Sequence, residues 1–218
     1  MASEDGQRAL DALEQIATEV SACQRCNLYR GAKHGVAGSG NPQAEVMLIG
    51  EAPSAYDDRS GRPFSGPSGT LLDELLALAG LTRADVYLTN VVKHHPQDSR
   101  PLEPGEIAAC APWLMRQIAV VNPLVIVPLG RYALARFLPR AKITQIHGQA
   151  RPMSGRIVVA MYNPAAALHK EELLQTVQDD FRRALPAALT EAHRLRAEGR
   201  LTPDTAPTDD APQQMSLF

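Results

Sequence analysis

The sequence has few of the residues that hold extracellular or membrane-bound proteins together. It contains three cysteines in 218 residues, an odd number that cannot all pair in disulfides, and its N-terminus is polar and acidic rather than a secretory signal. No apolar run approaches the roughly 20 residues that cross a bilayer. We therefore expect a cytoplasmic protein without a membrane span, whose thiols bind metal or stay reduced.

Basic charge is not in excess either. The chain has 22 Lys and Arg against 24 Asp and Glu, a formal net charge of -2. This excludes a protein coated in positive charge, but it leaves room for a local basic groove. A hydrophobic content of 44% is ordinary for a globular domain. The length suits one domain over residues 1–199, followed by a tail over 200–218.

Short apolar runs alternate with helical patterns along the chain. Uniformly apolar strands separated by helices are typical of a mostly parallel sheet that is covered on both faces. We expect an α/β fold of three layers, α/β/α, with a central four-stranded, mostly parallel sheet. The expected strands are 45–50, 86–92, 124–130 and 156–163. The expected helices are 7–22, 70–80, 103–121 and 169–189, with a break near Pro186.

Polar residues follow three of the expected strands directly. They are Glu51, the group at 93–95 and Asn163. In sheets of this kind, ligands bind beyond the carboxyl ends of the strands, so these residues should converge on one crevice. The long Gly-, Pro-, Ser- and Asp-rich segment at 51–69 shows no regular pattern, and loops of this length are usually functional.

Three segments together resemble family 4 uracil-DNA glycosylases, the iron–sulfur branch of the uracil-DNA glycosylase superfamily. They are GEAPSAYDDRSGRPFSG from Gly50, LTNVVK from Leu88 and YNPAAAL from Tyr162. The resemblance covers roughly residues 10–185 and is specific, because the motifs occur in order and interleave with the strands. It implies a base excision repair enzyme that flips uracil out of DNA, hydrolyses its N-glycosidic bond and leaves an abasic site.

The resemblance also implies roles for individual residues. Glu51 matches the carboxylate that acts on the hydrolytic water or stabilises the positively charged sugar. Phe64 matches the ring that stacks on the base, and Asn90 matches the amide that reads the edge of uracil, beside Gly50 and Ala52. Each residue also has a purely structural alternative. Glu51 could cap a helix or loop, Phe64 could be an ordinary core residue, and Asn90 could hydrogen-bond a neighbouring loop.

Asn163 departs from the family pattern, which has His at this position. That His is thought to hydrogen-bond the departing uracil anion. An amide N–H can donate the same bond but cannot become a cation. We therefore expect weaker stabilisation of the leaving group, by about 1–3 kcal/mol, unless His95 or His169 compensates.

The family holds a four-iron, four-sulfur cluster through four cysteines. Cys23, Cys26 and Cys110 match three of these positions, and the fourth falls on His94. The resemblance thus implies a 4Fe-4S cluster with three Cys ligands and one His ligand, and imidazole ligation raises a cluster's potential. Three alternatives are a structural zinc, a cluster with an exchangeable iron, and buried thiols without metal.

DNA contacts are expected from cations beside the strand ends. Lys93, Arg100 and Arg131 would position phosphates without reading sequence. The segment from Ala165 to His169 would wedge into the place of the flipped base. Solvated surface charge and simple helical propensity are the alternatives.

The tail has few apolar residues until its end. Its composition, rich in Pro, Asp and Thr, predicts disorder. Its last residues resemble the bacterial sliding-clamp-binding pentapeptide, which would raise the effective concentration of the protein at the replication fork. We expect a monomer near the nucleoid that acts on uracil-containing DNA. The alternatives are a slow or non-catalytic uracil-DNA-binding protein and a redox sensor. The residues of the clamp motif are Gln214, Met215, Leu217 and Phe218.

Overall fold

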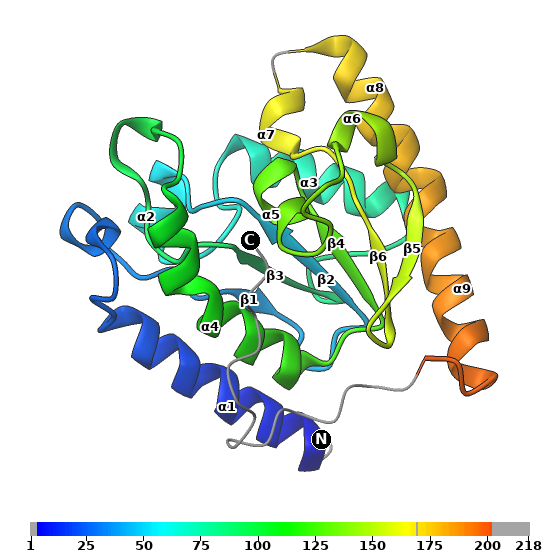
Figure 1. Ribbon diagram of the computed structural model, residues 1–218, viewed down its shortest axis with the longest axis horizontal. Helices are drawn as coiled ribbons and strands as arrows, with labels where there is room; N and C mark the ends of the chain where they lie inside the picture. Colours follow the sequence, from blue (N-terminus) through cyan, green and yellow to red (C-terminus); the bar gives the residue numbers. More distant parts are fainter. Residues whose placement is uncertain (1–3, 169, 202–218) are drawn as a thin grey trace.

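The centre of the protein is a six-stranded sheet with the strand order β1-β3-β2-β4-β6-β5. The computed structural model describes residues 4–168 and 170–201, and Figure 1 shows the sheet enclosed by helices. The four inner strands are parallel, and the two edge strands run antiparallel to their neighbours. The strands are β1 Ser39–Gly40, β2 Val46–Gly50, β3 Val86–Asn90, β4 Val125–Pro128, β5 Ala150–Met153 and β6 Arg156–Val159.

The inner strands are buried along their whole length. A parallel strand covered on both faces must be apolar at every position, and this is why β2, β3, β4 and β6 stand out in the sequence. The expected four-stranded parallel sheet is confirmed. The two edge strands were missed because β1 has only two residues and β5 is mostly exposed and contains Pro152.

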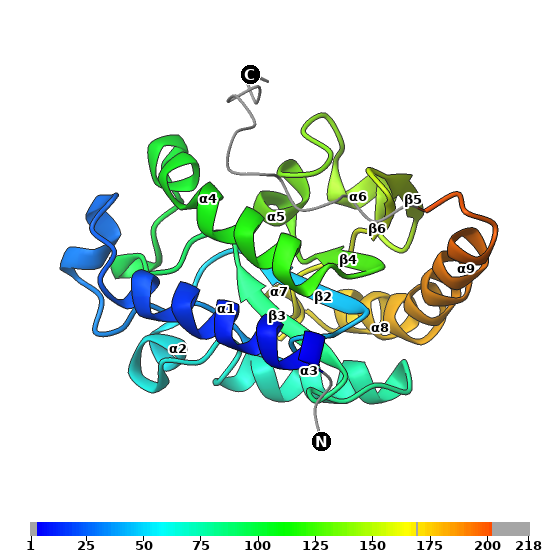
Figure 2. The ribbon, with the colours of Figure 1, turned by 90° about the horizontal axis from the view of Figure 1, so that it is seen from below.

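Helices cover the two faces of the sheet separately, as Figures 1 and 2 show. Met47 and Ile49 point to a cluster with α1 and α4, whereas Val46 and Leu48 point to a cluster with α3, α8 and α9. This alternation follows from the two-residue period of a strand. The α-helices are α1 Glu4–Ser21, α2 Ala55–Ser60, α3 Pro67–Leu78, α4 Pro104–Val121, α5 Arg131–Ala135, α6 Ile143–Ile146, α7 Pro164–Ala167, α8 Glu171–Asp179 and α9 Leu185–Ala197.

Two local expectations were wrong. The segment 51–69 contains α2, which begins because Ser54 and Asp57 cap each other's backbone N–H groups. The helix expected to break near Pro186 instead continues from α8 through a π-helical turn, η3 (Asp180–Ala184), into α9. Pro186 lies in the first turn of α9, where the missing N–H of a proline is best tolerated.

Two short 3₁₀ helices complete the described elements, η1 (Asn27–Arg30) and η2 (Gln97–Ser99). Within residues 4–168 and 170–201, no helix combines the length and the apolar character needed to span a bilayer.

Candidate active site

The carboxyl ends of the four parallel strands meet at one edge of the sheet. Gly50 at the end of β2 is level with Asn90 at the end of β3. Beyond β4 and β6, a bridge between Leu129 and Met161 continues the pairing. The residues that follow, Glu51 and Asn163 among them, therefore leave the sheet on the same side, as the strand pattern predicts.

Gly50, Phe64 and Asn90 lie in contact at this edge of the sheet and form the candidate pocket of the site. A Cβ on Gly50 would clash with the amide oxygen of Asn90 and lie 2.8 Å from Cζ of Phe64. Only glycine lets the amide and the ring come this close. Phe64 also belongs to the apolar cluster on the α3 side of the sheet, so the ring is a core residue whose tip reaches the pocket.

The amide of Asn90 carries the clearest sign of a missing partner. Asn90 is buried, and its Nδ2 has no hydrogen-bond partner among the residues that the structure describes. A buried donor without a partner costs free energy that a native fold normally avoids. A ligand that offers a carbonyl oxygen in this pocket would remove that cost.

Glu51 is half-buried and directly follows Gly50, the last residue of β2. Burial raises the pKa of its carboxyl, and the charge of Arg131 partly offsets the rise. Arg131 is the exposed first residue of α5, with its guanidinium over the Tyr132 ring at 4.7 Å. The ionised carboxylate can orient a water or stabilise a positively charged sugar at this position.

Asn163 is the N-cap of α7. Its Oδ1 accepts a hydrogen bond of 3.0 Å from the main-chain N–H of Ala165. Because the oxygen is used in this way, the Nδ2 group is the part of the amide left to donate to a ligand. Ala165 is exposed on α7, and Leu168, directly after this helix, is 40% exposed. His169 lies outside the described residues.

Comparison with known proteins places this arrangement in a family. The sequence profile described as "Uracil DNA glycosylase superfamily" matches residues 37–188. The chain belongs to this superfamily. Two relatives are type-4 uracil-DNA glycosylases. That of Sulfurisphaera tokodaii is 38% identical over 191 residues, 83% of this chain and 87% of the relative. That of Archaeoglobus fulgidus is 38% identical over 184 residues, with coverages of 80% and 92%.

The superfamily's type-5 branch is a more distant match. The type-5 uracil-DNA glycosylase of Thermus thermophilus is 35% identical over 149 residues, 59% of this chain and 68% of the relative. The type-4 matches extend over far more of the chain. The family that the three motifs indicate is therefore confirmed.

Lys93 is not a phosphate contact, and that prediction was wrong. Its side chain is fully buried, and its ammonium donates to Thr89 Oγ1 at 2.6 Å, to the main-chain oxygen of Asn90 at 2.8 Å and to Gln117 Oε1 at 2.7 Å. Three acceptors satisfy all three donors of the charged form, although burial lowers the pKa of Lys93 to about 7. Lys93 thus holds the end of β3 from inside the core.

Arg100 is partly exposed, but its charge is already paired. Its guanidinium forms a two-point ion pair with the buried carboxylate of Glu106 in the first turn of α4. This pair closes the loop between β3 and α4. A guanidinium held by two carboxylate oxygens has less to offer a phosphate than the exposed Arg131.

The three cysteines come together although they are far apart in sequence. Cys23, Cys26 and Cys110 lie close enough together that each of Cys26 and Cys110 has its pKa influenced by the other two thiols. Burial raises the pKa of the Cys110 thiol to about 11 and also raises that of Cys26. Buried thiols of this kind become thiolates at neutral pH when a metal replaces the proton.

Two further features of this group suit a cluster. Hydrogen bonding from the main chain of Leu28 and of Lys93 works against the rise in the pKa of Cys26 and Cys110, respectively, and such bonds tune iron–sulfur centres. Burial lowers the pKa of His94, which favours the neutral, metal-binding imidazole. However, no group of three or more His, Cys, Asp and Glu side chains in the described chain could hold a single metal ion.

Two residues that matter to the pocket were missed by sequence reasoning. Arg83 and Asp57 both bind the backbone around Phe64. Arg83 is 19 residues from its partner, in the loop between α3 and β3, and no motif marks it. Asp57 was visible only as one of several acidic residues in the 51–69 segment.

Proposed function

We propose that the protein is a uracil-DNA glycosylase of base excision repair. It takes a uracil that has left the DNA helix into the pocket of Gly50, Phe64 and Asn90, hydrolyses the N-glycosidic bond and leaves an abasic site. The observation that carries this proposal is the buried, unpartnered Nδ2 of Asn90. The type-4 names of the relatives support uracil as the base.

Uracil fits the amide because its edge alternates acceptor and donor. Nδ2 of Asn90 donates to the carbonyl oxygen of the base, and Oδ1 accepts from the neighbouring ring N–H. Cytosine carries an amino group in place of that oxygen, so two donors would face each other. The ring of Phe64 supplies the apolar face on which a flipped base stacks.

Bond cleavage follows from the residues around the pocket. The N-glycosidic bond breaks with positive charge on the sugar and negative charge on the leaving base. The carboxylate of Glu51 stabilises the sugar and orients the water, and Nδ2 of Asn163 donates to the departing base. Both groups lie at the carboxyl edge of the sheet, Glu51 directly after β2 and Asn163 after β6.

The test uses a duplex that contains one uracil. Protein in excess over DNA, followed by alkali, should cleave the strand at the uracil and leave a cytosine control intact. Asn90→Leu keeps the side-chain volume but removes both hydrogen bonds, and it should lower the single-turnover rate by about 100-fold or more. A wild-type protein that leaves the strand intact would refute the enzymatic proposal.

A second candidate function has its own supporting observation. Asn163 provides no imidazole, and its oxygen is occupied by the cap of α7. The protein would then bind uracil in DNA tightly and excise it slowly or not at all. Tight, uracil-dependent binding without cleavage at stoichiometric protein would select this function.

For the cysteines we propose a 4Fe-4S cluster held by Cys23, Cys26, Cys110 and His94. These residues lie on the 23–26 turn, on α4 and just after β3, so a bound cluster would tie these three segments together. Protein purified without oxygen should be brown and contain about four irons. His94→Cys should keep the iron, and His94→Ala should lose part of it. A colourless protein with one zinc would select the zinc alternative.

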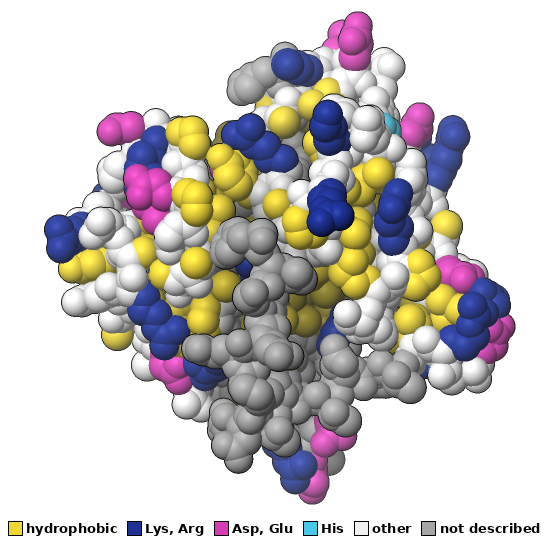
Figure 3. All heavy atoms as spheres, in the orientation of Figure 1, with side chains coloured by type: hydrophobic (Ala, Val, Ile, Leu, Met, Phe, Trp, Pro, Cys, Tyr) yellow, Lys and Arg dark blue, Asp and Glu magenta, His cyan; other side chains and the backbone are white. Residues whose placement is uncertain are grey.

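DNA contacts are proposed for the face formed by α5, α6 and β5, which begins at the pocket edge. No Asp or Glu occurs between Glu106 and Glu171, whereas eight Lys and Arg do. Lys and Arg side chains gather over these elements in Figure 3. In the described chain none of the following forms an ion pair with a carboxylate: Arg131, Arg136, Arg140, Lys142 and Arg151.

The clamp motif at 214–218 lies outside the described residues. We propose that it binds the bacterial sliding clamp and so brings the protein to replicating DNA in the nucleoid. Deletion of 214–218 should abolish co-elution with the clamp and leave excision on short duplexes unchanged. Continued co-elution of the shortened chain would refute the proposal.

A further inference from the structure

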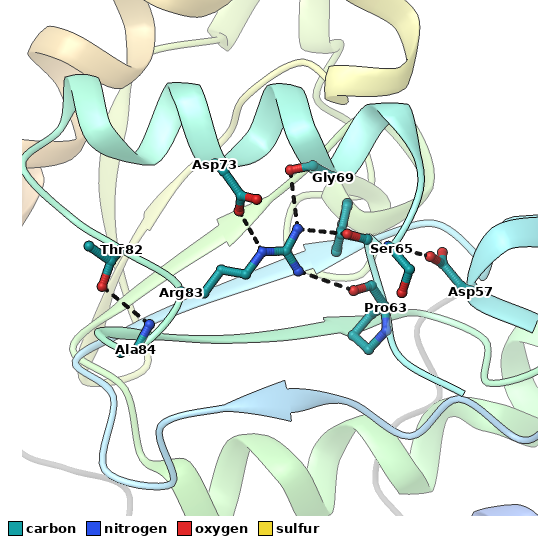
Figure 4. A network of polar contacts seen from close by, with 9 residues as sticks. Asp57, Pro63, Ser65, Gly69, Asp73, Thr82, Arg83 and Ala84 are labelled. Atoms are coloured by element: carbon teal, nitrogen blue, oxygen red, sulfur yellow. Dashed lines mark hydrogen bonds and ion pairs between the residues drawn. The ribbon is translucent and has the colours of Figure 1, made fainter. Parts of the chain in front are cut away.

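The peptide bond between Phe64 and Ser65 is held at both ends. Its oxygen accepts a hydrogen bond of 2.6 Å from Nη2 of Arg83, and its N–H donates to Oδ1 of Asp57 at 2.7 Å. Figure 4 shows the two charged side chains on opposite sides of this peptide. Two charge-assisted bonds to one peptide fix the orientation of its plane.

Arg83 is itself anchored to helix α3. Its Nε is paired with Asp73, and Nη2 also donates to the main-chain oxygen of Gly69 at 3.1 Å. A further contact of 3.5 Å joins Nη1 to the oxygen of Pro63. The guanidinium therefore bridges the turn that carries Phe64 and the first turns of α3, with little freedom of its own.

Asp57 ties the same peptide to helix α2. Its side chain is buried, and its second oxygen accepts from the main-chain N–H of Ser54 at 2.9 Å. Ser54 follows the Glu51-Ala52-Pro53 segment directly. One carboxylate thus connects the ring-bearing turn with the segment that carries the catalytic carboxylate.

Phe64 needs such support because of its backbone conformation. Its φ of +54° lies in the left-handed region, which residues with a Cβ adopt only when surrounding contacts hold them there. Gly69 permits the close approach, since a Cβ at that position would clash with the oxygen of Phe64. This conformation is the one that brings the tip of the ring to Gly50.

We propose that Arg83 is a positioning residue for base recognition, and that it acts with Asp57 through the Phe64–Ser65 peptide. It touches neither uracil nor the reacting atoms. Its role is to keep the ring in place before the base arrives, so that binding does not have to order the loop. The inference rests on the proposed function, because uracil is the ligand that the ring receives.

The experiment compares Arg83→Met with Arg182→Met. Both remove a partly exposed guanidinium that is paired with an aspartate, and Arg182 lies on η3, outside the site. Inhibition of excision by free uracil is measured at a temperature well below the Tm of each variant. Arg83→Met should raise the inhibition constant of uracil about 10-fold, and Arg182→Met should leave it unchanged. If Arg83→Met only destabilised the fold, it would lower the Tm and leave the inhibition constant of uracil unchanged.

A double-mutant cycle then tests the route of action. If Arg83 acts through Phe64, Arg83→Met should add nothing to the loss of uracil affinity in Phe64→Leu. Equal losses in both backgrounds, or no loss with Arg83→Met, would overturn the inference. Gly69→Ala should reproduce the loss of uracil affinity by displacing the same peptide oxygen, and it serves if Arg83→Met does not fold. Absence of uracil excision by the wild type would instead refute the proposed function.

Discussion

We expect Asn163 to limit the rate at which the proposed enzyme releases its base. The amide oxygen is used to cap α7, and the remaining N–H₂ donates without becoming charged. Asn163→His would place a group at the same strand exit that can carry a proton. We expect the single-turnover rate to rise about 10- to 100-fold, equivalent to about 1–3 kcal/mol. Loss of the cap should cost about 1 kcal/mol of folding stability.

The measurement for Asn163→His is excision under protein excess at a fixed pH. A change in rate without a change in uracil inhibition would place the effect on the leaving group. An unchanged rate would mean that another group, such as His95, already stabilises the departing uracil.

If Glu51 acts as the proposed carboxylate, Glu51 and Arg131 should together set the acidic limit of activity. Burial raises the pKa of Glu51, and Arg131 works against that rise. The carboxylate is the active form, so activity should fall as the pH drops through this raised pKa. Arg131→Gln removes the offsetting charge, and the pKa should rise further. In a plot of single-turnover rate against pH, the acidic side of the profile should therefore move to higher pH. An unchanged acidic side would contradict the electrostatic link between Arg131 and Glu51.

At the scale of elements, the end of β3 is supported from inside the core. Lys93 donates to Thr89, to Asn90 and to Gln117 of α4. Lys93→Met fills a similar volume but removes the ammonium that donates to these three acceptors. We expect the free energy of unfolding to fall by about 2–4 kcal/mol, as measured by urea denaturation.

Lys93→Met also distinguishes the two roles considered for Lys93, a buried support of β3 and a phosphate contact. If Lys93 lies in the core, the salt dependence of DNA binding should be the same in Lys93→Met and the wild type. A reduced salt slope with unchanged stability would restore the phosphate role.

The segment 51–69 shows what an element-level pattern can and cannot reveal. Its motif predicts a functional loop, and the ring of Phe64 approaches Gly50 at the edge of the sheet. Its internal helix α2 was missed because the capping pair of Ser54 and Asp57 is hidden among other polar residues. The contact with Arg83 could not be predicted, because it depends on how the α3–β3 loop packs against this turn.

At the scale of the whole molecule, charge is strongly polarised despite a net charge of -2. If the face of α5, α6 and β5 binds DNA, each neutralised cation there should reduce the salt slope of binding by about 1. The double variant Arg140→Gln and Lys142→Gln should therefore lower the slope by about 2. Arg182→Gln and Arg183→Gln on η3 remove the same charge elsewhere and should leave the slope unchanged.

The measurement is DNA affinity over a range of salt concentrations, with and without uracil in the duplex. Because phosphate contacts carry no base information, both duplexes should lose affinity equally. Equal effects from the two double variants would show that only net charge matters, and that this face has no special role.

The sequence by itself determined the parallel sheet, the edge at which the site lies and the family. Each rests on local information: fully buried strands are apolar at every position, and motifs keep their order along the chain. Only the tertiary structure decided that Lys93 points inward, that no described residue pairs with Nδ2 of Asn90, and that Arg83 holds Phe64. These facts depend on which side chains meet across the fold, and that geometry is set by packing rather than by position in the chain.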